Sequence, residues 1–78
     1  MRTSSLADLG TDRRARVVSV GGERTLRRRL LEMGLLPGTS ILVVRVAPLG
    51  DPIEIRLRGY SLSLRHADAR AIEVEASP

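Results

Sequence analysis

Residues 37–65 read PGTSILVVRVAPLGDPIEIRLRGYSLSLR, and the pattern that predicts the fold is clearest in this stretch. It contains three segments of strand-like composition, separated by short turns rich in glycine and proline: residues 40–47, 53–58 and 61–65. In the middle segment Ile53, Ile55 and Leu57 alternate with charged residues, which is typical of a strand with one buried face. The stretch therefore predicts consecutive short strands, and Gly59-Tyr60 predicts a tight hairpin between the last two.

Segments on either side extend this pattern. Residues 15–20 (ARVVSV) are β-branched and end at a Gly-Gly pair, and residues 71–75 (AIEVE) alternate apolar and acidic side chains. Residues 23–33 (ERTLRRRLLEM) predict the one substantial helix, which Gly34 is placed to end in the left-handed conformation. A short helical turn is expected within residues 4–10. Five short strands with close turns and one inserted helix predict a mainly β fold, a small barrel that leaves no free sheet edge.

Length and composition limit what the chain can be. With 78 residues, 42% of them hydrophobic, residues 1–78 are expected to form a single domain with a small core. The chain has no cysteine, which excludes disulfides, thiolate metal ligands and thiol chemistry. No stretch approaches the roughly 20 apolar residues of a membrane span, and the N-terminus lacks the apolar segment of a signal peptide. We therefore expect a cytoplasmic protein.

Residue types that carry catalysis or bind cofactors are scarce. A phosphate-binding P-loop requires lysine, and every basic side chain here is arginine. Ser63, His66 and Asp68 are the residue types of a hydrolase triad, but they lie too close in sequence for separate elements to orient the base. His66 and Asp68 would supply at most two ligands to a metal ion. We expect no catalytic residue, no metal site and no cofactor.

The excess positive charge lies in the first half of the sequence. Residues 1–38 carry eight arginines and four carboxylates, whereas residues 39–78 carry five of each. On the expected helix, three arginines share the face opposite the core, with one leucine among them: Arg24, Arg27, Arg28 and Leu31. Such a surface attracts nucleic acid, anionic lipid or an acidic protein, and charge alone does not choose among them.

A protein contact is the favoured interpretation of this surface, and a nucleic-acid-binding barrel is the alternative. Proteins that bind single strands stack bases on aromatic rings, and this chain contains one tyrosine, no phenylalanine and no tryptophan. Binding to duplex phosphates remains open, because it requires only arginines.

Two longer stretches, LRRRLLEMGLLPGT at 26–39 and RVAPLGDPIEIRLRGYSLSLR at 45–65, resemble the FeoA family of ferrous iron transport proteins. The resemblance covers about residues 15–75. The features that carry it are the helix end and the turns: Met33-Gly34-Leu35, Pro37-Gly38, Ala47-Pro48-Leu49-Gly50-Asp51-Pro52 and Gly59-Tyr60.

The resemblance implies an SH3-like β-barrel with an inserted helix. It also implies a partner, the membrane ferrous iron permease FeoB, whose cytoplasmic part carries a GTPase domain, and a role in assisting or regulating iron uptake. A similar domain is joined to a DNA-binding portion in iron-dependent repressors, so a free-standing relative of that domain is a second alternative.

We expect the partner to contact the arginine face of the helix together with apolar residues at or beside turns. The predicted partner-binding residues are Arg24, Arg27, Arg28, Leu31, Met33, Leu35, Leu36, Pro48 and Leu49. Weak self-association through a sheet edge is a further interpretation that the sequence leaves open.

Overall fold

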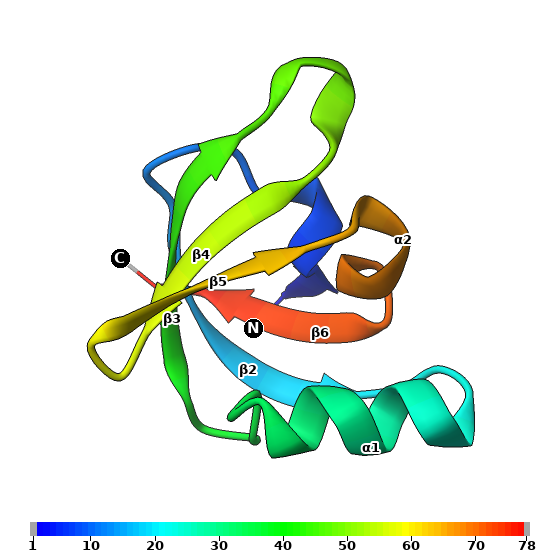
Figure 1. Cartoon of the computed structure of the whole chain (residues 1–78). Helices are drawn as coiled ribbons and strands as arrows, with labels where there is room; N and C mark the ends of the chain where they lie inside the picture. The colour runs from blue at the N-terminus through cyan, green and yellow to red at the C-terminus, as the bar shows by residue number, and fades with distance from the viewer. Residues whose placement is uncertain (1, 78) are drawn as a thin grey trace.

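The computed structural model describes residues 2–77 and arranges them as one antiparallel sheet with short helices (Figure 1). In chain order the elements are β1 (Thr3–Ser5), η1 (Leu6–Asp8), β2 (Arg14–Val20), α1 (Arg24–Glu32), β3 (Ser40–Val46), η2 (Pro48–Gly50), β4 (Ile53–Leu57), β5 (Tyr60–Leu64), α2 (His66–Ala69) and β6 (Ile72–Ala76). The strand order in the sheet is β1-β6-β2-β3-β4-β5. The mainly β fold expected from the sequence is confirmed.

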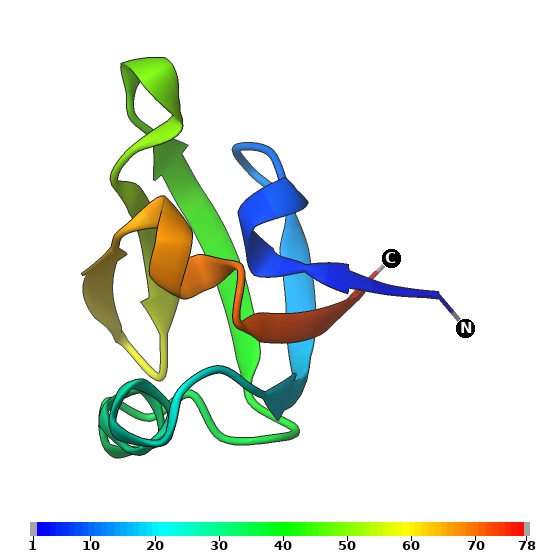
Figure 2. The same cartoon turned by 90° about the vertical axis from the view of Figure 1, so that its right-hand side faces the viewer.

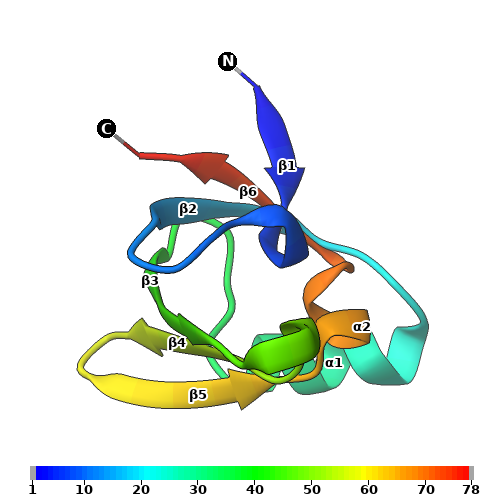
Figure 3. The same cartoon turned by 90° about the horizontal axis from the view of Figure 1, so that it is seen from above.

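The sheet curls round one apolar core but does not close on itself. β1 and β5 each have a hydrogen-bonded neighbour on one side only, so both are edges of the sheet. Figure 3 shows the strands wrapping round the interior, and Figure 2 shows α2 between β5 and η1 on the open side. There the Ser5 hydroxyl donates to the carbonyl oxygen of Ala69 at 3.2 Å. The small barrel is therefore as expected, but the expectation that it leaves no free sheet edge is wrong, because short helical segments fill the side where a strand pair would close it.

Three local predictions also need correction. The structure adds a strand, β1, to the five expected, because a three-residue polar strand has no alternation to reveal it. The residues between the predicted strands 61–65 and 71–75, to which the sequence analysis assigned no helix, form the short helix α2, whose Ala69 is buried. The hairpin turn is made by Arg58 and Gly59, both with positive φ (50° and 84°), so Tyr60 begins β5.

The alternation of apolar residues sets the inner face of the sheet as expected. Ile53, Ile55 and Leu57 of β4 are buried in the core. In β3 a bulge between Val43 and Arg45 shifts the register with β4 by one residue. Regular alternation along β3 is therefore interrupted at this bulge.

Helix α1 covers one end of the sheet (Figures 1 and 2). The Glu23 side chain caps it by accepting the Leu26 backbone N–H at 2.8 Å, as expected from a carboxylate at the positive end of a helix. At the other end Gly34 has a φ of 102°, and the Leu35 N–H donates to the Leu30 carbonyl oxygen at 3.1 Å. This is a Schellman motif, so the predicted left-handed end of the helix at Gly34 is confirmed.

Candidate functional site

The loop between β3 and β4 projects from one end of the molecule (Figures 1 and 2). Two backbone hydrogen bonds hold it: Ala47 N–H donates to the Pro52 carbonyl oxygen at 3.1 Å, and Gly50 N–H donates to the Ala47 carbonyl oxygen at 2.8 Å. Pro48 and Leu49, which we call the apex, are exposed. The Leu49 side chain is fully in solvent, with a relative exposure of 104%, and its φ is 72°. Leu49 is therefore a fully exposed leucine on a turn that is held by two backbone hydrogen bonds.

The outer side of α1 carries the predicted arginines around one shallow depression. Its lining includes Arg24, Arg27, Arg28 and Leu31, which we call the helix face. Arg27 is partly structural, because its Nε donates to the Val20 carbonyl oxygen at 3.0 Å. Leu31 is half-buried and packs against the core. The helix face therefore offers positive charge, but its leucine already contributes to the fold.

Leu35 does not belong to any surface, contrary to the sequence prediction. Its side chain has 0% relative exposure and packs in the core with Leu30. The Schellman motif turns the residue after the left-handed glycine back toward the helix, and an apolar residue there packs against the last turn. The two residues beside it differ: Leu36 is exposed and Met33 is half-buried at the end of α1.

The structure divides the predicted site into two groups. The apex lies at one end of the sheet, and α1 lies at the other end (Figure 1). Met33 is the C-cap of α1, and Leu36 follows it by three residues. The Cα positions span 28 Å along the longest axis of the molecule. The predicted surface is therefore two separate surfaces: Pro48 and Leu49 form one, and the helix arginines with Met33 and Leu36 form the other.

The outer face of the sheet carries a basic surface that the sequence analysis missed. Strand register brings together arginines from both halves of the chain, and three of them line one surface hollow with Ser40 and Leu42. We call this group the sheet-face cluster: Arg14, Arg16, Arg56 and Arg58. Dividing the charge by sequence halves hid this cluster, since it joins arginines some 40 positions apart. The alternation of charged residues in β2 and β4 was the signal available, but it needs the register with β3 to place the two strands.

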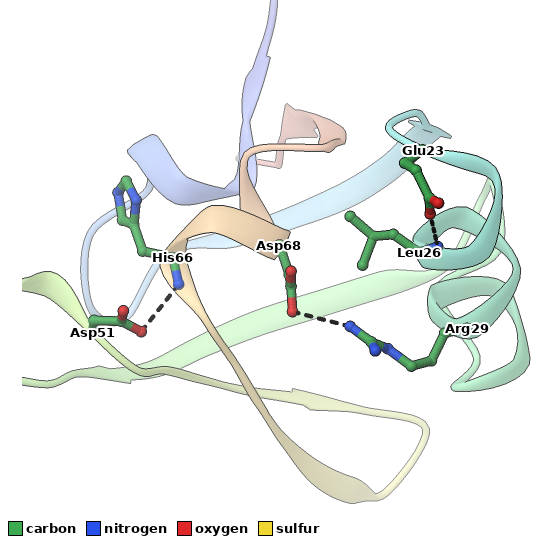
Figure 4. Close-up of polar contacts among 6 residues, drawn as sticks. All are labelled: Glu23, Leu26, Arg29, Asp51, His66 and Asp68. Atoms are coloured by element: carbon green, nitrogen blue, oxygen red, sulfur yellow. Dashed lines mark hydrogen bonds and ion pairs between the residues drawn. The ribbon is translucent and has the colours of Figure 1, made fainter.

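The residues of the supposed triad do not converge (Figure 4). The Asp68 carboxylate faces Arg29 at 3.4 Å, the one ion pair within the described part of the chain. The backbone N–H of His66 donates to Asp51 Oδ1 at 3.1 Å, while the imidazole points away from Asp68 (Figure 4). Ser63 is exposed on β5. No base is held against a nucleophile by this arrangement.

Over residues 2–77, no three histidine, aspartate or glutamate side chains are grouped so that they could hold one metal ion. Among the helices in that same range, none combines the length and the apolar character needed to cross a membrane.

The family model of the FeoA domain matches residues 4–76. The chain belongs to the FeoA family. A relative from Porphyromonas gingivalis, the Fe(2+) transport protein A/Fe(2+) transporter FeoB fusion protein, is 47% identical over 70 residues. That match covers 90% of this chain but 8% of the relative, so this chain corresponds to a small part of that fusion protein.

Solved structures of FeoA proteins share the fold. A FeoA-like protein from Clostridium acetobutylicum is 38% identical with a TM-score of 0.92, over 100% of this chain and 91% of that one. FeoA from Stenotrophomonas maltophilia, solved in complex with zinc and described as a prokaryotic SH3 domain protein, is 27% identical. Its TM-score is 0.81, over 91% of this chain and 88% of that one. The SH3-like fold that the resemblance implied is confirmed.

Proposed function

We propose that the chain is a non-enzymatic accessory of ferrous iron uptake, which docks on the cytosolic part of a FeoB-type membrane transporter and assists or regulates it. The observation that carries the proposal is the P. gingivalis relative, in which a domain 47% identical to this chain shares one polypeptide with FeoB. A covalent link keeps two partners at high effective concentration. We infer that the present domain binds the same kind of partner on the cytoplasmic side, and that this binding depends on a surface of the domain itself.

The backbone of the apex supports a docking role for Leu49. A left-handed conformation costs a leucine about 1–2 kcal/mol, and glycine or asparagine would adopt it more easily. The Leu49 side chain does not offset this cost by packing in the core, because it is fully exposed. Burial against a partner would contribute roughly 1.5–3 kcal/mol, which is enough to offset that cost. A leucine at this position is therefore explained by a contact that the isolated chain lacks.

The helix face is a second contact surface in this proposal, separate from the apex. Arg24 and Arg28 are exposed, while Arg27 and Leu31 are engaged with the rest of the fold. Charges at the rim of an interface affect the rate of association more than the affinity. We assign the anchor to the apex and a steering role to the charges of the helix face. The neighbouring Met33 and Leu36 add an apolar contact at that end of the molecule.

Separate variants test the two surfaces. Leu49→Glu should weaken binding to the isolated cytosolic part of the transporter at least tenfold, as expected for losing a buried leucine worth about 1.5–3 kcal/mol. Arg24→Gln with Arg28→Gln should weaken it only about fivefold, because each of the two exposed charges contributes roughly 0.5 kcal/mol. Titration calorimetry measures both affinities. Val18→Glu is the matched control, since Val18 is also an exposed apolar residue but lies on β2.

Two results would contradict the proposal at different levels. Full affinity in a folded Leu49→Glu variant would remove the apex from the interface. No binding by the unmodified chain to the cytosolic part would remove the docking function itself.

A further inference from the structure

The sheet-face cluster is an ordered array of arginines. Strand register places Arg14 and Arg56 in one row across β2, β3 and β4. Arg16 and Ser40 form the next row, and Arg58 follows Arg56 by two positions. Neighbouring strands lie about 4.8 Å apart and alternate residues along a strand about 6.8 Å apart. The four arginines therefore rise from a nearly rectangular patch of backbone, roughly 10 Å by 7 Å.

Carboxylates do not neutralise this face. Register places Glu75 opposite Arg16, and Glu54 opposite Arg45 on the same outer side of the sheet. With Arg45 added to the cluster, and with Glu73 counted beside Glu75 on β6, five arginines and three glutamates leave a net charge of +2. Within residues 2–77 none of these five arginines forms an ion pair. Arg58 Nη2 donates to the Thr39 hydroxyl at 3.5 Å, and most guanidinium donors of the cluster remain free for a ligand.

The chemistry of the face favours a surface of phosphate groups over a protein or a single-stranded nucleic acid. The centres of protein interfaces are poor in charge and rich in aromatic residues, whereas the cluster surrounds one half-buried leucine, Leu42. Base stacking needs aromatic rings, and the hydroxyl of Tyr60 is held at the end of α1 by the Met33 carbonyl oxygen. Attraction to an anionic leaflet needs only charge near the surface, and arginine pairs well with phosphate oxygens.

We propose that the sheet-face cluster binds the phosphate groups of an anionic lipid leaflet, so that the outer face of β2, β3 and β4 lies on the membrane. An array of this size gives reversible rather than permanent attachment. The apex and α1 lie at the two ends of the sheet (Figure 1). A chain resting on the leaflet by this face therefore keeps both ends available to a protein partner. The proposal goes beyond docking on the transporter and does not depend on it.

Flotation with lipid vesicles tests the proposal without any transporter. The full chain should float with vesicles of equal parts phosphatidylglycerol and phosphatidylcholine at low ionic strength. Arg14→Gln with Arg56→Gln should weaken this partition roughly 30-fold. Each arginine near an anionic leaflet strengthens binding about five- to sixfold, and the two factors multiply. The matched control is Arg24→Gln with Arg28→Gln, which removes the same charge from the helix face and should change the partition less than about threefold.

Three results would overturn the proposal. Equal losses in the two double variants would mean that net charge, and not this face, governs binding. Equal flotation with vesicles of phosphatidylcholine alone would mean that anionic phosphate is not recognised. Tighter binding to duplex DNA than to the anionic vesicles, lost in Arg14→Gln with Arg56→Gln, would identify nucleic acid as the ligand. All substituted side chains are exposed, and matching thermal unfolding curves would show that the fold is kept.

Discussion

Leu49 combines a left-handed backbone with a fully exposed side chain, and this combination can be tested by stability alone. Leu49→Asn should raise the free energy of unfolding by about 0.5–1 kcal/mol, because asparagine tolerates the left-handed region better than leucine. Leu36→Asn is the control, since Leu36 is also exposed but has no positive φ. Urea unfolding measures both. An equal change in the two variants would show that Leu49 carries no backbone strain.

Gly34 is a second position where one residue decides local structure. Its φ is 102°, and a Cβ there would press against the Tyr60 hydroxyl. Gly34→Ala should therefore lower the free energy of unfolding by about 2 kcal/mol or more, and Tyr60→Phe in the same chain should restore part of that loss. Gly10→Ala is the matched control, because open space surrounds Gly10 and its φ is not positive. A Gly34→Ala variant as stable as Gly10→Ala would contradict the Schellman motif.

At the scale of the element, β5 is an edge strand whose own residues carry no protection against pairing, although α2 lies beside it on the open side. Its sequence, YSLSL, contains no charge and no proline, which are the devices that keep sheet edges from pairing. The two-residue hairpin makes Leu57 and Tyr60 a hydrogen-bonded pair, so Ser61 and Ser63 direct their backbone groups away from β4. In an antiparallel dimer centred on Leu62, Ser61 would face Ser63 of a second copy. Weak self-association through β5 therefore stays a prediction of this account.

The test of this edge uses two substitutions at one position. Ser61→Pro removes the N–H that points to the free edge and should abolish self-association, whereas Ser61→Ala keeps that N–H and should not. Sedimentation equilibrium at high protein concentration measures the association. Self-association of Ser61→Pro at the level of the unmodified chain would exclude β5 as the interface.

Periodicity decided which elements the sequence could predict. β4 and α1 were readable because their apolar residues repeat over several turns or pleats, and Glu23 and Gly34 mark the helix ends. β1 and α2 are three and four residues long, too short for any period to show. Leu35 was misplaced because the turn after Gly34 was treated as a loop, although the Schellman motif predicts an inward residue there.

Placement of the site residues depends on the whole molecule. Whether the apex and α1 share a face depends on the path of the chain between them. That path cannot be predicted from local sequence patterns. The sheet-face cluster likewise requires the register of three strands. The structure thus separates three surfaces that the sequence merged or missed: the apex, the helix face and the sheet-face cluster.

The central claim is that this FeoA domain acts by docking through the apex on a FeoB-type transporter. The most direct measurement records the backbone amide chemical shifts of the ¹⁵N-labelled chain by NMR while the unlabelled cytosolic part of the transporter is added. We predict shifts of the backbone amides of Leu49, Gly50 and Asp51, with the amide of buried Ile55 in β4 unchanged. No shifts at the apex, with changes confined to α1 or to the outer face of the sheet, would contradict the account.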